Sequence, residues 1–425
     1  MLKFNEDLLQ FLWQYKILKP LPFVTTKGKE IVVLKHGELN RDSGPDFFNA
    51  QIKIDEVILV GNIEVHIKTS DWLKHKHQQD KNYDNIILHV VYEHDTELDQ
   101  NKTNNVEVLE LKSLIAESTL ATYNQLSSAK TKIACHNQLA GLNDFKFISW
   151  LERMTLERLE GKVNAIENYF KSVAGDYTQT FYFLLLRNFG FKVNSLPFEL
   201  LAKNLPVTTL LKHSDNLLQL EALLLGTCGL LENQFEDKYI LQLQNEFDYL
   251  KNKYRIIPLN KEGFKFSKMR PANFPTIRLA QFAKLVNTKP GLFIAPYDFA
   301  NYEEIVLALK INLEGYWKNH YNMDGKVTSK DLALGLSSIE NLVINTFAPF
   351  YFFYSKRTSK PEMTDLALEL LNKCDFEQNT KTKLFEEKKA LLKTAADSQA
   401  AINLYDNYCS KKACLNCGVA ASLLK

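Results

Sequence analysis

A strand-like hairpin in the N-terminal part constrains the fold of this chain more than any other feature. Phe47 to Ile54 alternates as a strand does, Asp55-Glu56 supplies a turn, and Val57 to Thr69 returns the chain. In the returning strand, residues of equal parity share a face. The prediction is therefore one apolar face and one ionic face, and the ionic face carries Glu64, His66 and Lys68.

Further segments around this hairpin predict a small mixed sheet with helices. A polar start and the absence of internal Gly and Pro favour a helix after the hairpin, and the apolar run that follows is typical of a buried central strand. In chain order, the expected elements are a helix at Asn5–Ile17, a strand at Lys29–Leu34, the hairpin, a helix at Ser70–Tyr83, a strand at Asn85–Tyr92 and an edge strand at Val106–Leu111.

Two acids in this block have a spacing that indicates metal-dependent chemistry. Asp46 follows Pro45 at the entrance of the first hairpin strand, and Glu64 comes eighteen residues later in the returning strand. A divalent cation needs several hard oxygen ligands and open positions for water and phosphate, so carboxylates from neighbouring strands can supply half of such a site. The alternative is a pair of solvated acids on a strand surface, because short motifs recur by chance.

In this order of elements and in these acids, roughly the first quarter of the chain resembles the PD-(D/E)XK nuclease superfamily. The resemblance implies that Asp46 is the motif aspartate, that Glu64 is the second acid, and that His66 stands where lysine is usual. Glu6, on the expected first helix, would match the helical acid that some members add. These matches imply that the three acids bind magnesium or manganese and that a metal-bound hydroxide attacks a phosphodiester of nucleic acid.

His66 is where the chain departs from that family. A neutral imidazole gives a developing phosphorane less electrostatic help than lysine does, but it can act as a base or as a metal ligand. Lys68, on the same predicted face, is a replacement for the missing lysine. Because variants of these motifs also occur in inactive proteins, loss of activity is an alternative.

Histidines are concentrated in the same block, where six of the nine fall between His36 and His94. On the expected helix, His75 and His77 are two residues apart and cannot share a face, so we expect one to close over the site and the other to lie at the surface. His89 sits among aliphatic residues and is expected in the core. The competing chemistry is a transition-metal site.

That competing site would be built from His66, His89 and Asp46, since imidazole nitrogen suits transition-metal ions. It would serve a different metal-dependent hydrolase, acting on a small phosphoester or amide. Such an enzyme needs the histidines gathered around the acids.

The composition is that of an ordinary globular protein. Of 425 residues, 45% are hydrophobic and 24% are charged, and this length predicts two or three domains. The formal net charge of +2 leaves any nucleic-acid binding to a local basic surface.

The first residues lack the pattern of a secretory signal, and no apolar run is long enough for a membrane span. We therefore expect a cytoplasmic, reduced protein without membrane contact.

Helical signals dominate after the sheet. The prediction is an α+β domain at residues 1–115, with a small mixed sheet, followed by a predominantly α-helical domain at 116–425 that ends in a cysteine-rich segment. Within the second part, Leu217–Leu231 is apolar nearly all round, which favours a central buried helix.

One segment of the helical part interleaves basic residues with Phe, Asn and Pro, a pattern that favours contact with a phosphate backbone. The alternative is a buried arginine that ties down an irregular loop. The residues expected to contact nucleic acid are Lys268, Arg270 and Arg278 here, with His75 and His77 from the N-terminal block.

Three of the six cysteines fall within nine residues at the C-terminus, namely Cys409, Cys414 and Cys417. Thiolates at such spacing can bind one zinc ion or an iron–sulfur cluster. The fourth ligand is missing locally, and Cys374 is the first choice, followed by Cys135 or a histidine. Reduced surface thiols are the alternative.

Motifs spread over the whole chain also resemble an uncharacterised bacterial family that is defined only as a domain of unknown function. They are Gly44–Phe47, Gly61–His66, Ser70–Trp72, Arg270–Arg278, Ala395–Gln399 and the terminal cysteines. This resemblance implies no activity. The sequence thus predicts a metal-dependent nuclease or nuclease-derived protein, with an inactive interaction scaffold and a different metal-dependent hydrolase as alternatives.

Overall fold

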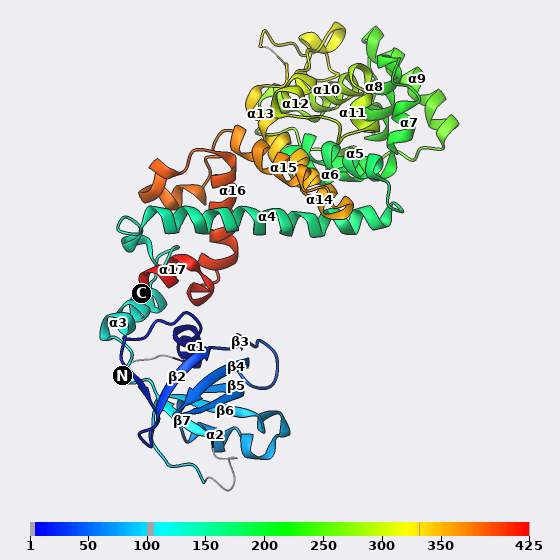
Figure 1. Ribbon diagram of the computed structural model, residues 1–425. Coiled ribbons are helices and arrows are strands. Elements are labelled where there is room, and N and C mark those ends of the chain that lie inside the picture. The colour runs from blue at the N-terminus through cyan, green and yellow to red at the C-terminus, as the bar shows by residue number, and fades with distance from the viewer. Residues whose placement is uncertain (1–4, 100–105, 331, 425) are drawn as a thin grey trace. The chain divides into compact units, whose positions relative to one another are not determined.

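The computed structural model describes residues 5–99, 106–330 and 332–424, and the chain divides into two compact units (Figure 1). The first unit comprises Met1–Leu151, Asn379–Leu391 and Ala401–Lys425, and the second comprises Glu152–Gln378 and Leu392–Ala400. The sheet and its surroundings therefore extend past the predicted boundary at residue 115, and the C-terminal segment belongs with them.

A mixed sheet forms the N-terminal part of the first unit, as predicted. Its strand order is β1-β2-β4-β5-β6-β7, with β3 beside β4; the neighbours up to β5 pair antiparallel, whereas β5, β6 and β7 pair parallel. The strands are β1 (Phe23–Val24), β2 (Glu30–Lys35), β3 (Glu38–Leu39), β4 (Phe47–Ile54), β5 (Val57–Lys68), β6 (Ile86–Glu93) and β7 (Glu107–Glu110).

The predicted hairpin is β4 and β5, joined at Asp55, whose φ of 50° makes the tight turn. An irregularity in β4 changes which side chains face the core. Asn49 has a φ of 56°, and the register with β5 shifts between Phe47 and Ala50. The predicted apolar face that included Phe48 is therefore wrong at that position, because the bulge turns Phe47 inward instead.

Both faces of the sheet are covered around β5. Helix α1 (Glu6–Gln14) packs its apolar side, which includes Leu8 and Leu12, into one core with Ile63 and Val65 of β5. A smaller cluster around Trp72 covers part of the sheet on which Val91 and Val108 lie. Glu64 and His66, which alternate with the core residues of β5, are consequently buried as well.

The predicted helix over Ser70–Tyr83 is broken into three short pieces. They are α2 (Asp71–Lys74) and the 3₁₀ turns η1 (His77–Gln79) and η2 (Lys81–Tyr83). The cause lies at Lys76, which adopts a left-handed conformation with φ 61° and ψ 30° and so cannot continue an α-helix. His77 consequently takes a direction that helical spacing does not predict.

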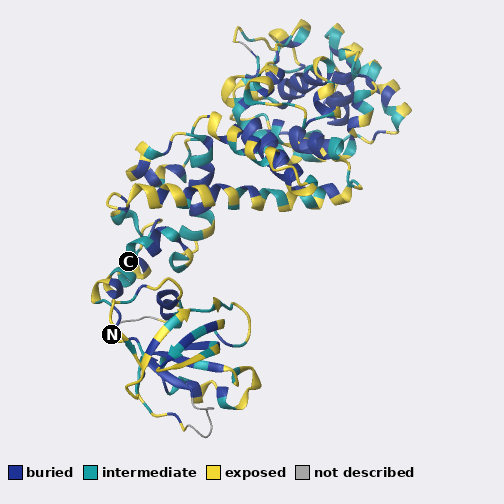
Figure 2. Ribbon diagram, viewed as in Figure 1, coloured by how far each residue is buried: buried dark blue, intermediate teal, exposed yellow. Residues whose placement is uncertain are grey.

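Helices make up most of the rest of the chain, and the buried residues in Figure 2 gather inside each unit. The predicted central helix is α8 (Leu217–Thr227), buried from Leu220 to Thr227. None of the helices in the described part of the chain is both long and apolar enough to cross a membrane. The others are α3 (Glu117–Ser128), α4 (Asp144–Ser172), α5 (Tyr177–Phe189), α6 (Phe191–Asn204), α7 (Val207–Leu211), α9 (Lys238–Tyr254), α10 (Pro275–Thr288), α11 (Gly291–Ile294), α12 (Tyr302–Leu309), α13 (Leu336–Leu342), α14 (Ala348–Thr358), α15 (Glu362–Lys373), α16 (Ala395–Leu404) and α17 (Gly418–Leu424).

Candidate metal centre

Asp46 and Glu64 are held side by side where β4 meets β5. The backbone N–H of Asp46 donates to Glu64 Oε2 at 3.2 Å, and the backbone N–H of Val65 donates to Asp46 Oδ2 at 2.9 Å. Gln10, from α1, donates from Nε2 to Asp46 Oδ1 at 2.9 Å. The two strands and the first helix together therefore fix the positions of both carboxyl groups.

Burial is the main cause of a raised pKa at both acids, and the charge of each neighbour adds to it. Glu64 raises the pKa of Asp46, and Glu6 raises the pKa of Glu64. The pKa of Glu6 is itself raised, first by its own partial burial. Three acids from α1, β4 and β5 thus lie close enough to repel one another, which a bound cation would relieve.

Three histidines, His66, His75 and His77, lie next to these acids. The imidazole of His66 contacts the other two. His66 Nε2 lies 3.1 Å from His75 Nδ1, 3.3 Å from His77 Nε2 and 3.4 Å from Glu64 Oε1. His77 Nε2 is also 3.3 Å from Glu64 Oε1. The three imidazole nitrogens all lie within 4.8 Å of one another.

These spacings are those of ligands around a single ion. In a tetrahedral site with metal–ligand bonds of about 2.0–2.1 Å, neighbouring ligand atoms are about 3.3–3.4 Å apart. The four contacts that join Glu64, His66, His75 and His77 are between 3.1 and 3.4 Å. Three imidazole nitrogens therefore surround one point, and the carboxylate of Glu64 lies beside two of them.

The expectation that one of His75 and His77 closes over the site and the other lies at the surface agrees with the burial of the two rings, but both of them contact His66. Because Lys76 interrupts the helix, the two imidazoles are not on opposite sides of a continuous helix, and both approach His66. His77 is buried against Trp72 and Tyr83, whereas His75 is exposed. The only signal in the sequence was the concentration of histidines in this block.

The protonation states of the two buried histidines suit metal binding. Burial, followed by the neighbouring imidazoles of His77 and His75, lowers the pKa of His66 to about 3. Burial also lowers the pKa of His77, although the nearby acids oppose this. Both rings are consequently neutral at neutral pH and can offer a lone pair to a cation.

His89 lies behind His66 rather than beside the acids. Its Nε2 is 2.9 Å from His66 Nδ1, the ring nitrogen opposite the one that faces Glu64. The contacts of the described residues therefore join His89 to His66 but not to Asp46, the third member of the predicted transition-metal site of His66, His89 and Asp46. His75 and His77 approach the Nε2 side of His66.

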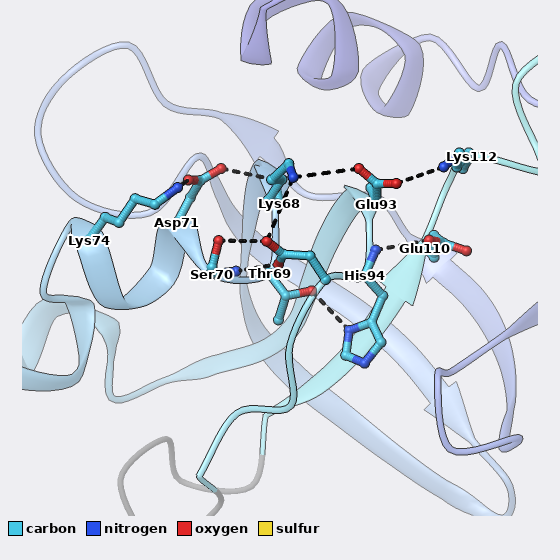
Figure 3. Close-up of polar contacts among 10 residues, drawn as sticks. Lys68, Thr69, Ser70, Asp71, Lys74, Glu93, His94, Glu110 and Lys112 are labelled. Carbon is cyan, nitrogen blue, oxygen red and sulfur yellow. Dashed lines mark hydrogen bonds and ion pairs between the residues drawn. The ribbon is translucent and has the colours of Figure 1, made fainter.

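Lys68 is engaged at the end of β5 (Figure 3). Its Nζ lies 3.7 Å from Glu93 Oε2 and 3.9 Å from Asp95 Oδ2, and its backbone N–H donates to Asp71 Oδ2 at 2.9 Å. Glu93 in turn pairs with Lys112 at 2.7 Å. The lysine that sequence reasoning offered as a replacement for the missing family lysine is thus paired with Glu93 and Asp95 at the end of the strand.

Of the residues predicted to contact nucleic acid in the helical part, Arg278 is buried. Its guanidinium donates to Gln281 Oε1 at 2.9 Å and to Asn273 Oδ1 at 2.6 Å, and it lies 4.3 Å from the ring centre of Phe191. A guanidinium in this position ties down its own loop and is not available to a phosphate backbone. Lys268 and Arg270 are exposed.

The cysteines are distributed differently from the first choice made from the sequence. Cys374 follows α15 in the second unit, where burial and then the charge of Glu340 raise the pKa of its thiol. Cys135 lies in the first unit with the three C-terminal cysteines, and the thiols of this group interact with one another. The second choice for the missing ligand is therefore the cysteine that the fold brings to this group.

Comparison with known proteins gives one family. A family described as "Protein of unknown function (DUF2851)" matches residues 6–380. No curated protein matches the chain, and no solved structure does.

Proposed function

The chain belongs to the DUF2851 family, whose description names no activity, and from the metal centre we propose that it hydrolyses phosphodiester bonds in nucleic acid with the help of a bound metal ion. The observation that carries this proposal is the ligand-like spacing of His66, His75 and His77 beside the carboxyl groups of Glu64 and Asp46.

The donor set favours a transition-metal ion over magnesium. Magnesium prefers six oxygen ligands and keeps several waters, whereas imidazole nitrogen suits ions such as zinc. Three imidazoles around a single point therefore favour zinc as the resident ion and leave a fourth position for water. When bound, such an ion lowers the pKa of a water molecule and supplies a nucleophile at neutral pH.

Residues of the chain would bind the ion and transfer the proton. His66 and His77 are buried ligands with fixed positions, and His75 is the ligand on the solvent side. Glu64 is buried beside the imidazoles of His66 and His77. Asp46 is held through both of its oxygens, and its raised pKa suits a group that takes a proton from water and returns it to a leaving oxygen.

The order of elements around the centre supports nucleic acid as the substrate. Helix α1 comes first, then the antiparallel pair β4 and β5, then α2, and then β6 parallel to β5. Asp46 lies at the entrance of β4 and Glu64 within β5. This arrangement is the one that the resemblance to PD-(D/E)XK nucleases implies, except that His66 stands where that family has lysine and that His75 and His77 contact it.

A second candidate is a metal-dependent hydrolase of a small phosphoester or amide. The observation in its favour is that His66, His75 and His77 gather with the acids, which such an enzyme requires and the nuclease resemblance does not imply. The substrates distinguish the two candidates, because both use the same ligands.

The test is cleavage of labelled single- and double-stranded DNA and RNA by the full-length protein with magnesium, manganese or zinc, together with the metal content of the protein. We expect cleavage that is lost in Glu64→Gln, which removes the carboxylate beside His66 and His77, and in His75→Ala, which removes a ligand. His94→Gln is the matched control, because His94 contacts Thr69 and Glu97 instead.

Each negative outcome has a separate meaning. Bound metal without cleavage of any nucleic acid, but with hydrolysis of small phosphoesters or amides, would support the second candidate. A folded protein without bound metal and without cleavage would leave an interaction scaffold and would overturn both enzymatic proposals.

A further inference from the structure

The C-terminal cysteines lie in a compact loop that turns their side chains together. The backbone N–H of Ala413 donates to the carbonyl of Tyr408 at 2.9 Å, which closes the loop after Cys409. Cys414 begins the 3₁₀ turn Cys414–Asn416, and the N–H of Cys417 donates to its carbonyl at 3.0 Å. Because residues three apart eclipse one another in a 3₁₀ turn, Cys414 and Cys417 lie on the same side.

Cys135 approaches this loop from a distant part of the sequence. It follows helix α3, and the segment that leads to it is tied to the loop by Lys412, whose Nζ donates to the carbonyl of Ala129 at 3.1 Å. Four thiols make up this group, namely those of Cys135, Cys409, Cys414 and Cys417. Each of the four interacts electrostatically with the other three. All four are free rather than joined in disulfides.

The surroundings protect this group on one side. Cys417 is buried, and Gly418, which follows it, packs so closely on Trp150 that a Cβ at this position would lie 2.4 Å from the indole ring. The Trp150 ring also meets Tyr408 at a centroid distance of 5.8 Å. This packing partly encloses the cysteines, which therefore do not lie on an open surface.

Four thiolates in a partly buried place would repel one another, so these cysteines need a cation if they are to ionise. Burial and the other cysteines raise the pKa of Cys135 to about 12, and burial raises the pKa of Cys417 to about 11. Without a metal, the group is consequently protonated at neutral pH. Four cysteine thiolates are the usual ligand set of structural zinc and of [4Fe–4S] clusters.

Among the described residues, the lack of a close trio of these sulfurs favours the cluster over one zinc ion. Around zinc, a Zn–S bond of about 2.3 Å places the sulfurs about 3.8 Å apart, whereas in a [4Fe–4S] cluster each thiolate binds a different iron and the sulfurs stand wider. Among the described residues, no three of these cysteines have sulfurs that all lie within 4.8 Å of one another. We propose that Cys135, Cys409, Cys414 and Cys417 bind one [4Fe–4S] cluster.

Such a cluster would fasten the segment after α3 to the C-terminal loop, and it does not depend on the hydrolase proposal. Cys414 also lines a pocket of about 600 Å³, together with residues of α1 and of the loop Leu39–Asp42. Small molecules can therefore reach the cluster from that side, and we expect oxygen to degrade it.

The test is the iron and acid-labile sulfide content of full-length protein purified without oxygen. We expect about four iron and four sulfide per chain and a brown absorption that dithionite bleaches. Cys414→Ser and Cys135→Ser should each lose most of this iron, whereas Cys374→Ser, in the other unit, should retain it. Circular dichroism checks that the variants fold, and if one does not, the wild-type content still decides.

The proposal is overturned by either of two results on the wild-type protein. One is about one zinc per chain with no sulfide, which would assign the four thiols to a single ion. The other is the absence of metal after anaerobic purification and after reconstitution with iron and sulfide. Retention of full iron and sulfide in Cys135→Ser would also overturn it, because the fourth ligand would then lie elsewhere.

Discussion

His66 Nδ1 lies 2.9 Å from Nε2 of His89, and both rings are buried. This contact determines which nitrogen of His66 can bind a cation. If Nδ1 carries the proton and donates to His89, then Nε2 is left with a free lone pair on the side that faces Glu64. His89 is therefore a positioning residue, and the aliphatic residues around it fix its ring in place.

We predict that His89→Phe weakens metal binding about 10- to 100-fold, since the ring that accepts from His66 Nδ1 is lost. His89→Gln should restore part of the affinity, because its amide oxygen can accept the same hydrogen bond. The measurement is competition for the metal with a chelator of known affinity. Equal affinity of wild type and His89→Phe, with both proteins folded, would contradict the role assigned to this contact.

Metal binding should strengthen with rising pH through the neutral range and release protons. The reason is that the pKa values of Asp46 and Glu64 are raised, chiefly by burial, so part of their carboxyl population is protonated before the metal binds. The pKa of His66 is lowered, so its ring does not compete. Calorimetry in buffers of different ionisation enthalpy measures the released protons, and Glu64→Gln should release fewer.

Proton release that is equal in wild type and Glu64→Gln would show that this carboxyl is ionised before binding. Affinity that rises only between pH 5 and 6.5 would instead indicate a histidine with an ordinary pKa as the controlling group.

The sheet was predictable because its signals are local. Alternation and turn residues gave the β4–β5 hairpin, and an apolar run gave β6, with boundaries within one or two residues of those found. The two acids followed from the same pattern, since each lies at a definite place in a strand. Helices with strong apolar spacing, such as α8, were found for the same reason.

The parts that sequence reasoning missed depend on single backbone conformations or on distant contacts. The left-handed conformations of Asn49 and Lys76 redirect Phe47 and His77, and neither residue type signals such a conformation with certainty. The preference for Cys135 over Cys374 beside the C-terminal loop involves residues about 280 positions apart, and only tertiary packing determines it.

The conformation of Lys76 offers a direct test of how His77 is positioned. Lys76→Gly should keep metal affinity and stabilise the protein by up to about 1 kcal/mol, because glycine adopts a φ of 61° without strain. Lys76→Pro should weaken metal binding at least tenfold, since proline requires a φ near −65° and removes the N–H that donates to Leu73. Chelator competition and thermal unfolding measure the two effects.

Lys76→Ala is the control that separates backbone from charge. It removes the ammonium but keeps an L-residue in the left-handed region, so its metal affinity should resemble that of wild type. If Lys76→Pro bound metal as tightly as Lys76→Ala, the interruption of the helix would not be what brings His77 to the centre.

A buried carboxyl group in the second unit should make stability depend on pH. Glu221 is 3% exposed, and its Oε2 accepts from Tyr239 Oη at 2.8 Å and from Trp317 Nε1 at 2.6 Å. Burial raises the pKa of Glu221 from 4.5 to about 7, although both donors oppose this. Between these values the folded protein holds a proton that the unfolded chain has lost, so the contribution of Glu221 to stability falls as pH rises.

We therefore expect the difference in unfolding free energy between wild type and Glu221→Gln to shift by about 3 kcal/mol between pH 4.5 and 7, to the disadvantage of wild type at the higher pH. Glutamine keeps an oxygen that accepts from Tyr239 and Trp317 but does not titrate. Urea unfolding of both proteins at each pH, monitored by circular dichroism, gives this difference. Titrating groups that both proteins share affect both free energies equally, so their effects cancel in the difference. Parallel stability curves across this range would mean that Glu221 is ionised in the folded protein and that its two donors outweigh its burial.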